Sequence, residues 1–264
     1  MSKYEKQYNK IAKNILKTGE LRNTRSGWAY SLPFQELNAS LKHNMFPLLT
    51  CREIFYKGVA GEYAAMIRGP KNIKDFQKWG CNYWNEWGDI SSGDLRLDYG
   101  NLWIDYDGIN QIEELIKTIK DDPHSRRLLI NGWRPNNNLS LPCCHYSYQF
   151  YVSNNSIDLL WTQRSGDWMV GVPSDMTFAA IMLICIANLC DLTPRNIKMI
   201  IGDAHIYLEH KLNAKLQIEK EILSPPMYSI QKQLGESGDV GFMPTDLEII
   251  NYKNQGKLKY DLKK

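Results

Sequence analysis

The stretch HYSYQFYVSNNSIDLLWTQRS, residues 145–165, decides the fold class of this chain. Two runs with strong strand character flank the polar segment SNNS (153–156), a pattern typical of a β-hairpin. A hairpin pairs its strands antiparallel, whereas the strands of a doubly wound parallel sheet are joined by helical crossovers. The sequence therefore favours a mixed α+β fold.

The segments on both sides of the hairpin alternate irregularly between helix and strand patterns. They contain no internal repeat and no Gly/Ser/Pro linker, so residues 1–264 are expected to form a single domain. Apolar spacing and turn signals predict the remaining elements. These are helices over 4–17, over 107–120 with Asp107 as the N-cap, and over 176–190; strands over 126–133 and near 198–201; and a last helix carrying Ile206, Leu212 and Leu216.

The composition argues against several functional classes. Of the 264 residues, 43% are hydrophobic, and the net charge is only +3 with no long basic block, so no nucleic-acid partner is expected. The six cysteines form no CxxC pair and the N-terminus has no apolar signal segment, which indicates free thiols in a reduced, cytoplasmic compartment. The apolar run 176–190 is too short for a membrane span. The histidines of HIYLEH (205–210) would not share a helical face, and no metal site is expected.

Two adjacent cysteines, Cys143 and Cys144, directly precede the first hairpin strand in the segment LPCCH (141–145). A cysteine is most often a small buried hydrophobe, and the alternative is a nucleophile. Arginines and a serine elsewhere offer the guanidinium and hydroxyl groups that bind a phosphate monoester. They are Arg25, Arg164, Ser165 and the adjacent pair Arg126 and Arg127. As part of a strand, the two adjacent arginines would point to opposite faces, and the alternative for this pair is a solvated strand edge.

Together these segments resemble the thymidylate synthase family from about Leu16 to Tyr252. LPCCH is similar to the family's L-x-P-C-H segment, which places Cys144 at the nucleophile position and leaves Cys143 as a structural neighbour. The other matching segments follow in family order. They are FPLLT (46–50), WNEW (84–87), Tyr99-Gly100, DPHSRR (122–127), QRSGDWMVGVPSD (163–175) and GDAHIYLEH (202–210).

The resemblance implies a large twisted mixed sheet, flanked by helices, through which two subunits form a homodimer. It also implies transfer of a one-carbon unit from the co-substrate 5,10-methylenetetrahydrofolate to C5 of a pyrimidine nucleotide, without a metal. The Cys144 thiolate would attack C6 and make C5 nucleophilic. A positive field from Arg164 would lower the pKa of this thiol.

The resemblance assigns roles to further side chains. Glu62 and Tyr99 would handle proton transfers, and His145 and Gln163 would support the residues around the nucleotide. The nucleotide would contact Arg25, Gln163, Arg164, Ser165, Asp175, His205 and Tyr207 and, from the second subunit, Arg126 and Arg127. The folate would contact Trp84, Trp87, Asp167 and Gly171.

Asp175 departs from the family pattern, because relatives that act on dUMP carry an asparagine there. An amide donates to O4 of uracil and accepts from N3–H. Cytosine has the opposite pattern, a donor at N4 and an acceptor at N3. A carboxyl group matches this pattern by accepting from N4–H and by sharing a proton with N3. Asp175 therefore points to dCMP, as in the deoxycytidylate hydroxymethylases that are similar to this family. The alternative is a tolerated variation in a uracil enzyme.

The C-terminal sequence LKYDLKK (258–264) is a second departure. Thymidylate synthases end in a short apolar segment that closes over the site and keeps water out before hydride transfer. A charged tail should seal less well, so that water adds to the exocyclic methylene intermediate and gives a hydroxymethyl group.

The sequence thus leads to the hypothesis of a folate-dependent deoxycytidylate 5-hydroxymethyltransferase, an activity that serves DNA base modification and is encoded by phage. A phage enzyme would act in the host cytoplasm. The first alternative is a reductive methylase that makes dTMP from dUMP or 5-methyl-dCMP from dCMP. The second is a catalytically silent nucleotide- or RNA-binding homologue.

Overall fold

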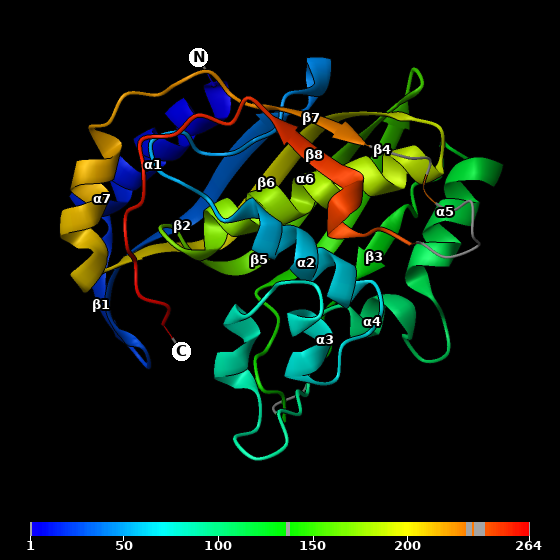
Figure 1. Ribbon diagram of the computed structural model, residues 1–264, viewed down its shortest axis with the longest axis horizontal. Coiled ribbons are helices and arrows are strands. Elements are labelled where there is room, and N and C mark those ends of the chain that lie inside the picture. Colours follow the sequence, from blue (N-terminus) through cyan, green and yellow to red (C-terminus); the bar gives the residue numbers. More distant parts are fainter. Residues whose placement is uncertain (1, 136–137, 231–233, 235–240, 264) are drawn as a thin grey trace.

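The computed structural model describes residues 2–135, 138–230, 234 and 241–263. Its main sheet has six strands in the order β1-β2-β6-β5-β4-β3 (Figure 1). Only the β5–β6 pair is parallel, and the other four pairs are antiparallel. The predicted mixed α+β class is therefore confirmed. The strands are β1 (Glu20–Thr24), β2 (Gly27–Ser40), β3 (Leu129–Asn131), β4 (His145–Ser153), β5 (Ser156–Asp167) and β6 (Thr193–Tyr207).

The hairpin that suggested this class joins β4 and β5, with Ser153 paired to Ser156. Asn154 and Asn155 between them have φ values of 50° and 55°. Two successive residues at positive φ form the turn whose twist matches that of antiparallel strands, and asparagine tolerates this conformation well. The predicted SNNS turn is confirmed.

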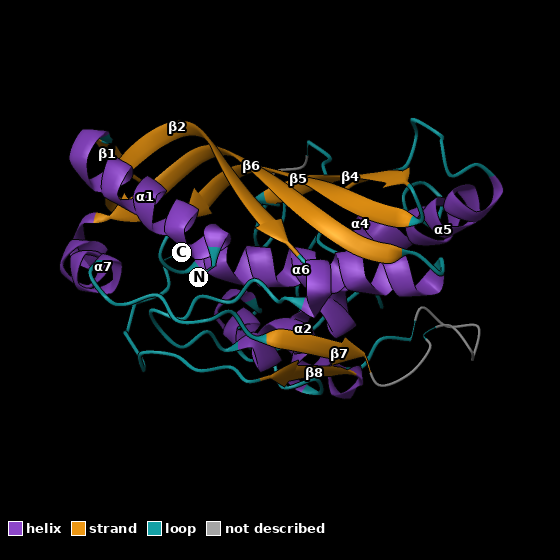
Figure 2. Ribbon diagram, turned by 90° about the horizontal axis from the view of Figure 1, so that it is seen from above, coloured by secondary structure: helices purple, strands orange, loops and turns teal. Residues whose placement is uncertain are grey.

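The helices gather mainly on one side of the main sheet. In Figure 2 helix α6 lies against one face of the sheet, and α2 and the small β7–β8 sheet form a further layer beyond α6. These and the remaining elements are α1 (Lys3–Thr18), α2 (Tyr56–Met66), α3 (Ile73–Gln77), α4 (Asn101–Ile104), α5 (Gln111–Asp121), α6 (Gly171–Leu189), α7 (Lys211–Ile218), β7 (Met227–Ile230), β8 (Leu247–Ile250) and the short 3-10 turns η1 (Lys42–Asn44), η2 (Tyr83–Trp87), η3 (Leu208–His210) and η4 (Pro244–Asp246).

Helix α6 forms the centre of the core, with nearly all of its residues from Val172 to Ala187 buried. It is long and apolar enough to cross a membrane by length and composition alone, but most of it is enclosed by the rest of the protein. It begins five residues earlier than the predicted start at 176. The added first turn carries Gly171 and Asp175 and thereby brings them beside the end of β5.

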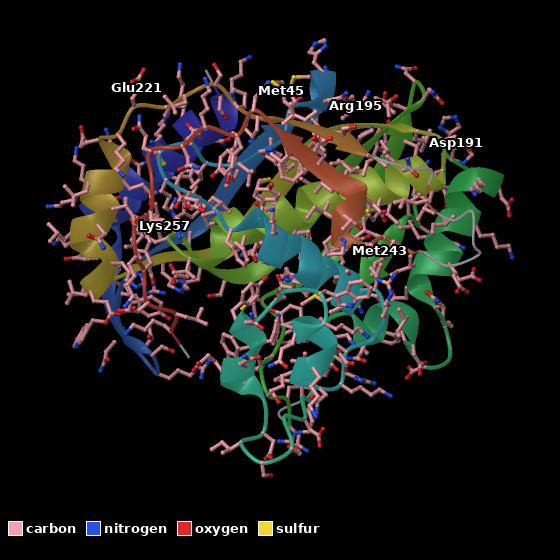
Figure 3. The ribbon with its side chains drawn as sticks, in the orientation of Figure 1. Met45, Asp191, Arg195, Glu221, Met243 and Lys257 are labelled. Atoms are coloured by element: carbon pink, nitrogen blue, oxygen red, sulfur yellow. The ribbon has the colours of Figure 1, made fainter. Side chains whose placement is uncertain are left out.

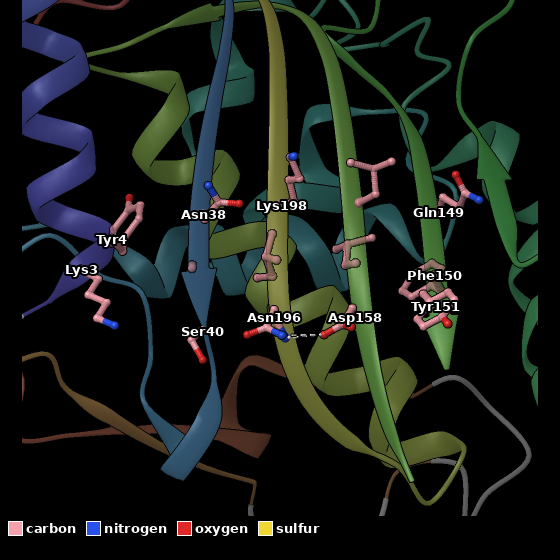
Figure 4. A pocket seen from close by; sticks show the side chains of 14 residues that line it. Lys3, Tyr4, Asn38, Ser40, Gln149, Phe150, Tyr151, Asp158, Asn196 and Lys198 are labelled. Carbon is pink, nitrogen blue, oxygen red and sulfur yellow. Dashed lines mark hydrogen bonds between the residues drawn. The ribbon is translucent and has the colours of Figure 1, made fainter. Parts of the chain in front are cut away.

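The opposite face of the sheet lies open in the described part of the chain. Alternate residues of β4 and β5 are buried and half-exposed, as expected when one face packs on a core. A hollow of about 590 Å³ lies on this open face and contains none of the predicted site residues (Figure 4). Its polar lining includes Asn38, Gln149, Asp158 and Lys198.

Three local predictions were wrong. Helix α5 is capped by Asn110, whose side chain accepts from the Ile112 and Glu113 amides, while Asp107 sits at φ 53° in the preceding turn. Strand β3 begins only at Leu129, so Arg126 and Arg127 lie in the turn before it. Finally, Ile206 belongs to β6, and the leucines of α7 face solvent: Leu212 is 70% exposed and Leu216 54%.

Candidate active site

Cys144 lies just before β4 and is held from two sides. Its carbonyl oxygen accepts from the Arg164 amide at 2.8 Å, and its own amide donates to the Tyr99 hydroxyl. The Arg164 Nη2 atom lies 3.8 Å from its sulfur. Cys143, in contrast, is 2% exposed and directs its carbonyl oxygen to Arg164 Nε at 2.8 Å. Of these two cysteines only Cys144 is partly exposed, and a nucleophile must be reachable by its substrate.

The electrostatic balance at Cys144 differs from the expected one. Burial raises the pKa of this thiol above its usual value, and the positive charges of Arg164 and Arg25 oppose the rise without overcoming it. The prediction that Arg164 favours the thiolate is thus correct in sign, but the net direction is upward. Desolvation is the largest of these contributions, and it therefore sets the net direction.

Glu62 projects from α2, and its carboxyl group accepts hydrogen bonds from two side chains. The Tyr83 hydroxyl donates to its Oε2 and the Trp84 indole N–H to its Oε1, both at 2.6 Å. Burial raises the pKa of this carboxyl to about 7, although both hydrogen bonds favour the charged form. A group that exchanges its proton near neutral pH suits general acid–base catalysis.

The free energy of unfolding should fall more steeply with rising pH in the wild type than in Glu62→Gln. The folded carboxyl keeps its proton up to about pH 7, whereas the unfolded chain loses it near ~4.3. Between these values only the folded state holds the proton, so raising the pH destabilises it by up to ~1.4 kcal/mol per unit. Urea denaturation at several pH values measures the slope, with the exposed Glu86→Gln as the control. Equal slopes in wild type and Glu62→Gln would contradict the assignment.

Asp175 enters the site from the first turns of α6. Its Oδ2 accepts from Gln163 Nε2 at 3.0 Å. Burial raises the pKa of Asp175 to about 7, and the charges of Glu62 and Asp167 add to the rise. The carboxyl is therefore near its midpoint at neutral pH, and it can accept one hydrogen bond while offering a proton for another.

The ends of β5 and β6 bring together Asp167, His205 and Tyr207. Asp167 and His205 are paired across the parallel strands, and Asp167 Oδ1 also accepts from the Met169 amide at 2.9 Å. Burial lowers the pKa of His205, but the Asp203 hydrogen bond and the charges of Asp167 and Asp203 outweigh it, so the net pKa is raised. Tyr207 is 9% exposed and feels the charges of both Asp167 and Arg25.

The two sets of predicted phosphate ligands lie in different places. Arg25, in the exposed turn between β1 and β2, is close enough to act on the charge of Cys144, and Ser165 lies next to Arg164 on β5. Arg126 and Arg127 instead lie exposed between α5 and β3, where Arg127 lines a separate hollow with Tyr106. Within one subunit they do not join the site.

A hollow of about 420 Å³ includes in its wall Tyr83, the residue that donates to Glu62. The four predicted folate residues do not line this hollow themselves, but Trp84 and Gly171 directly follow lining residues in the chain. Trp84 is 4% exposed and stacks on Phe76, with 5.0 Å between ring centroids, and Trp87 leans against Trp84 at 5.6 Å. Gly171 lies one residue beyond Val170, which lines the hollow. Its other walls include Phe55, Tyr83, Met169, Ser174, Lys257 (labelled in Figure 3) and Tyr260.

The C-terminal segment is docked beside this hollow. The Tyr260 hydroxyl donates to Gln217 on α7 at 2.9 Å, and Lys263 forms an ion pair with Glu209 at 2.6 Å. Arg52 lies over the Tyr260 ring, 5.2 Å from its centroid. The charged tail thus contacts the protein through polar groups; its last residue, Lys264, lies outside the described residues.

Sequence reasoning missed three residues that shape the site. Tyr83 holds Glu62, Tyr260 lines the hollow, and Trp161 donates its indole N–H to Gln163 Oε1 at 2.8 Å. Only Trp161 carried a usable signal, because its spacing of two from Gln163 on a predicted strand puts both side chains on one face. The other two contacts join segments far apart in the chain.

Comparison with known families gives a match over nearly the whole chain. The family model described as thymidylate synthase matches residues 6–263. The matched range includes every predicted site residue. Within the described residues, no group of three His, Cys, Asp or Glu side chains could hold a metal ion.

Proposed function

The chain belongs to the thymidylate synthase family, and from this premise we propose that it transfers a one-carbon unit from 5,10-methylenetetrahydrofolate to C5 of dCMP and releases 5-hydroxymethyl-dCMP. Family membership supports the coarser statement, folate-dependent one-carbon transfer to C5 of a pyrimidine. The choice of base and of product rests on the residues of the site.

The observation that carries the choice of dCMP is the buried carboxyl of Asp175. One of its oxygens would accept from N4–H of cytosine, and its proton would be shared between the other oxygen and N3. The pKa of about 7 makes that proton available at neutral pH. Uracil presents an acceptor at position 4, and the ionised form of the carboxyl has no donor to offer it there.

In the proposed reaction the Cys144 sulfur forms a bond to C6, and the electron pair of the C5–C6 double bond moves toward C5 and the N3–C4 side of the ring. C5 then bonds to the methylene carbon supplied by the folate and loses its proton, which would pass through water with the help of Tyr99, the residue that accepts from the Cys144 amide. Tetrahydrofolate leaves, water adds to the exocyclic methylene, and the Cys144–C6 bond breaks. Glu62 supplies and removes protons near pH 7.

The C-terminal segment supports water rather than hydride as the final reactant. Lys257 and Tyr260 line the hollow whose wall includes Tyr83. The Tyr260 hydroxyl also donates to Gln217 on α7, and Lys263 is paired with Glu209 of η3. A lining with ammonium and phenol groups admits water more readily than an apolar seal does.

One assay tests the proposal. The protein is incubated with 5,10-methylenetetrahydrofolate and either dCMP or dUMP, and the nucleotide product is identified by mass. Hydroxymethylation leaves tetrahydrofolate, whereas reductive methylation produces dihydrofolate, so absorbance separates the two reactions. A 5-hydroxymethyl-dCMP product is expected; dihydrofolate formation with dUMP as the preferred substrate would favour a thymidylate synthase instead.

The family is typically homodimeric, and we propose that the open sheet face is the interface. Its half-exposed mixture of apolar and polar residues, including Leu160 and Tyr151, suits contact with a second copy. Arg126 and Arg127, exposed and remote from the site of their own subunit, would then complete the phosphate site of the partner.

Mixing two inactive variants should restore activity if the site is shared. An Arg126→Ala subunit weakens nucleotide binding at the site of the subunit with which it pairs, and a Cys144→Ser subunit lacks the nucleophile in its own site. A hybrid dimer of the two contains one site with an intact thiol and intact arginines. After complete subunit exchange in an equal mixture, about a quarter of wild-type activity is expected. Activity is measured before and after exchange, and tagged subunits verify that exchange has occurred. If neither Arg126→Ala nor Arg127→Ala regains activity after exchange with Cys144→Ser, the shared site is excluded.

A further inference from the structure

Gln163 lies in a fixed orientation between Trp161 and Asp175. It is 1% exposed, and Trp161 is fully buried. An indole N–H can only donate, so the Gln163 atom that faces it at 2.8 Å must be the acceptor Oε1. On the other side Nε2 donates to the Ser165 carbonyl oxygen at 3.1 Å. Both contacts demand the same amide orientation.

The consequence falls on Asp175. With this orientation Gln163 presents an N–H to Asp175 Oδ2 at 3.0 Å. A donated hydrogen bond stabilises negative charge on the oxygen that accepts it. It also disfavours a proton on that oxygen, because the proton would then face the amide N–H. Oδ2 is thus the oxygen best prepared to release a proton to a ligand.

The indole itself is held firmly. Its ring centroid lies 4.5 Å from that of His145 and 4.8 Å from that of Tyr148. His145 and Tyr148 are further tied together by a 2.6 Å hydrogen bond. Phe178 closes the cluster at 6.0 Å. Trp161 cannot turn its N–H elsewhere without displacing these rings.

We propose that Trp161 is a positioning residue for base recognition: through Gln163 it makes Asp175 Oδ2 the oxygen that passes its proton to N3 of cytosine, while Oδ1 accepts from N4–H. This inference rests on the proposed use of dCMP. A proton on N3 draws electrons from the ring and makes C6 a better target for the Cys144 sulfur, so the relay acts on the chemical step as well as on recognition. If Gln163 turned its Oε1 toward Asp175, the carboxyl proton would stay bound to that oxygen.

The test compares Trp161→Phe with Trp103→Phe. Phenylalanine keeps an aromatic ring but leaves Gln163 Oε1 without a donor. Trp103 is also fully buried and packs against Tyr148 and Phe178, but it lies outside the relay, so it controls for loss of an indole from this cluster. Thermal unfolding is recorded for each variant.

For Trp161→Phe we expect kcat with dCMP to fall roughly 10- to 100-fold, with KM changed by less than about threefold. The ratio of kcat/KM for dCMP to that for dUMP should fall by about tenfold or more, whereas Trp103→Phe should leave this ratio unchanged. A purely structural role would lower activity with both nucleotides equally, and that result, or an equal change in Trp103→Phe, would overturn the relay.

A second variant, Gln163→Met, tests the relay if Trp161→Phe does not fold. Gln163→Met removes the hydrogen bond from Trp161 together with those to Ser165 and Asp175, at similar volume, and should reproduce the loss of selectivity. Where both variants fold, the double variant should be no worse than Gln163→Met, because residues acting through one relay are not additive. A wild type that prefers dUMP would refute the proposed function; a wild type that prefers dCMP with an unchanged ratio in Gln163→Met would refute only the relay.

Discussion

Cys144→Ser should lower kcat by roughly 10⁴-fold or more, because a serine hydroxyl is far less ionised and less nucleophilic than a thiol. Cys144 is the partly accessible member of the thiol pair, and Arg164 Nη2 lies 3.8 Å from its sulfur. Nucleotide binding should survive, since the arginines and Asp175 remain. Turnover and dCMP affinity are measured on the same preparation.

Cys143→Ser is the matched control for this change. Its side chain is 2% exposed and faces the core, so we expect kcat within about tenfold of wild type and a loss of stability of ~1–3 kcal/mol from the buried hydroxyl. Chemical denaturation measures the second effect. A dead Cys143→Ser with an active Cys144→Ser would mean that the nucleophile is the preceding residue.

Asp175→Asn should exchange the preferred base. The amide oxygen would take the place of Oδ2, where Gln163 donates, and would accept from N3–H of uracil, while the amide N–H would donate to O4. Cytosine then faces mismatched groups at two adjacent positions. A site built on specific hydrogen bonds discriminates by up to ~10⁴–10⁵, and we expect kcat/KM for dCMP to fall by at least ~10².

The gain with dUMP should be smaller than the loss with dCMP, because the other residues around the base remain those of the wild type. Values of kcat/KM for both nucleotides on both proteins decide the matter. Asp175→Ala serves as the control, since it removes both polar groups and should lower activity without favouring uracil. A wild type that prefers dUMP would refute the cytosine assignment.

The sequence by itself determined the features that depend on local pattern. The strand patterns and polar turn of HYSYQFYVSNNSIDLLWTQRS specified a hairpin and hence an antiparallel pair of strands. The ordered motifs also identified Cys144, Asp175 and Gln163, which the structure brings into one site. Local pattern failed where several residues compete for one role: Asn110 caps α5 in place of the predicted Asp107, and β3 excludes the Arg126–Arg127 pair.

Only the tertiary structure decided the ionisation of the site and the orientation of its polar groups. Burial raises the pKa of Glu62 and of Asp175 to about 7, and it also outweighs Arg164 at the Cys144 thiol. Desolvation depends on every segment packed around a group, and those segments come from distant parts of the chain. The bond from Trp161 to Gln163 takes effect because Asp175, twelve residues farther along the chain, is brought to the same amide. The physical reason is that residue spacing sets which face a side chain occupies, whereas its proton affinity and hydrogen-bond partners are set by neighbours that only the folded chain supplies.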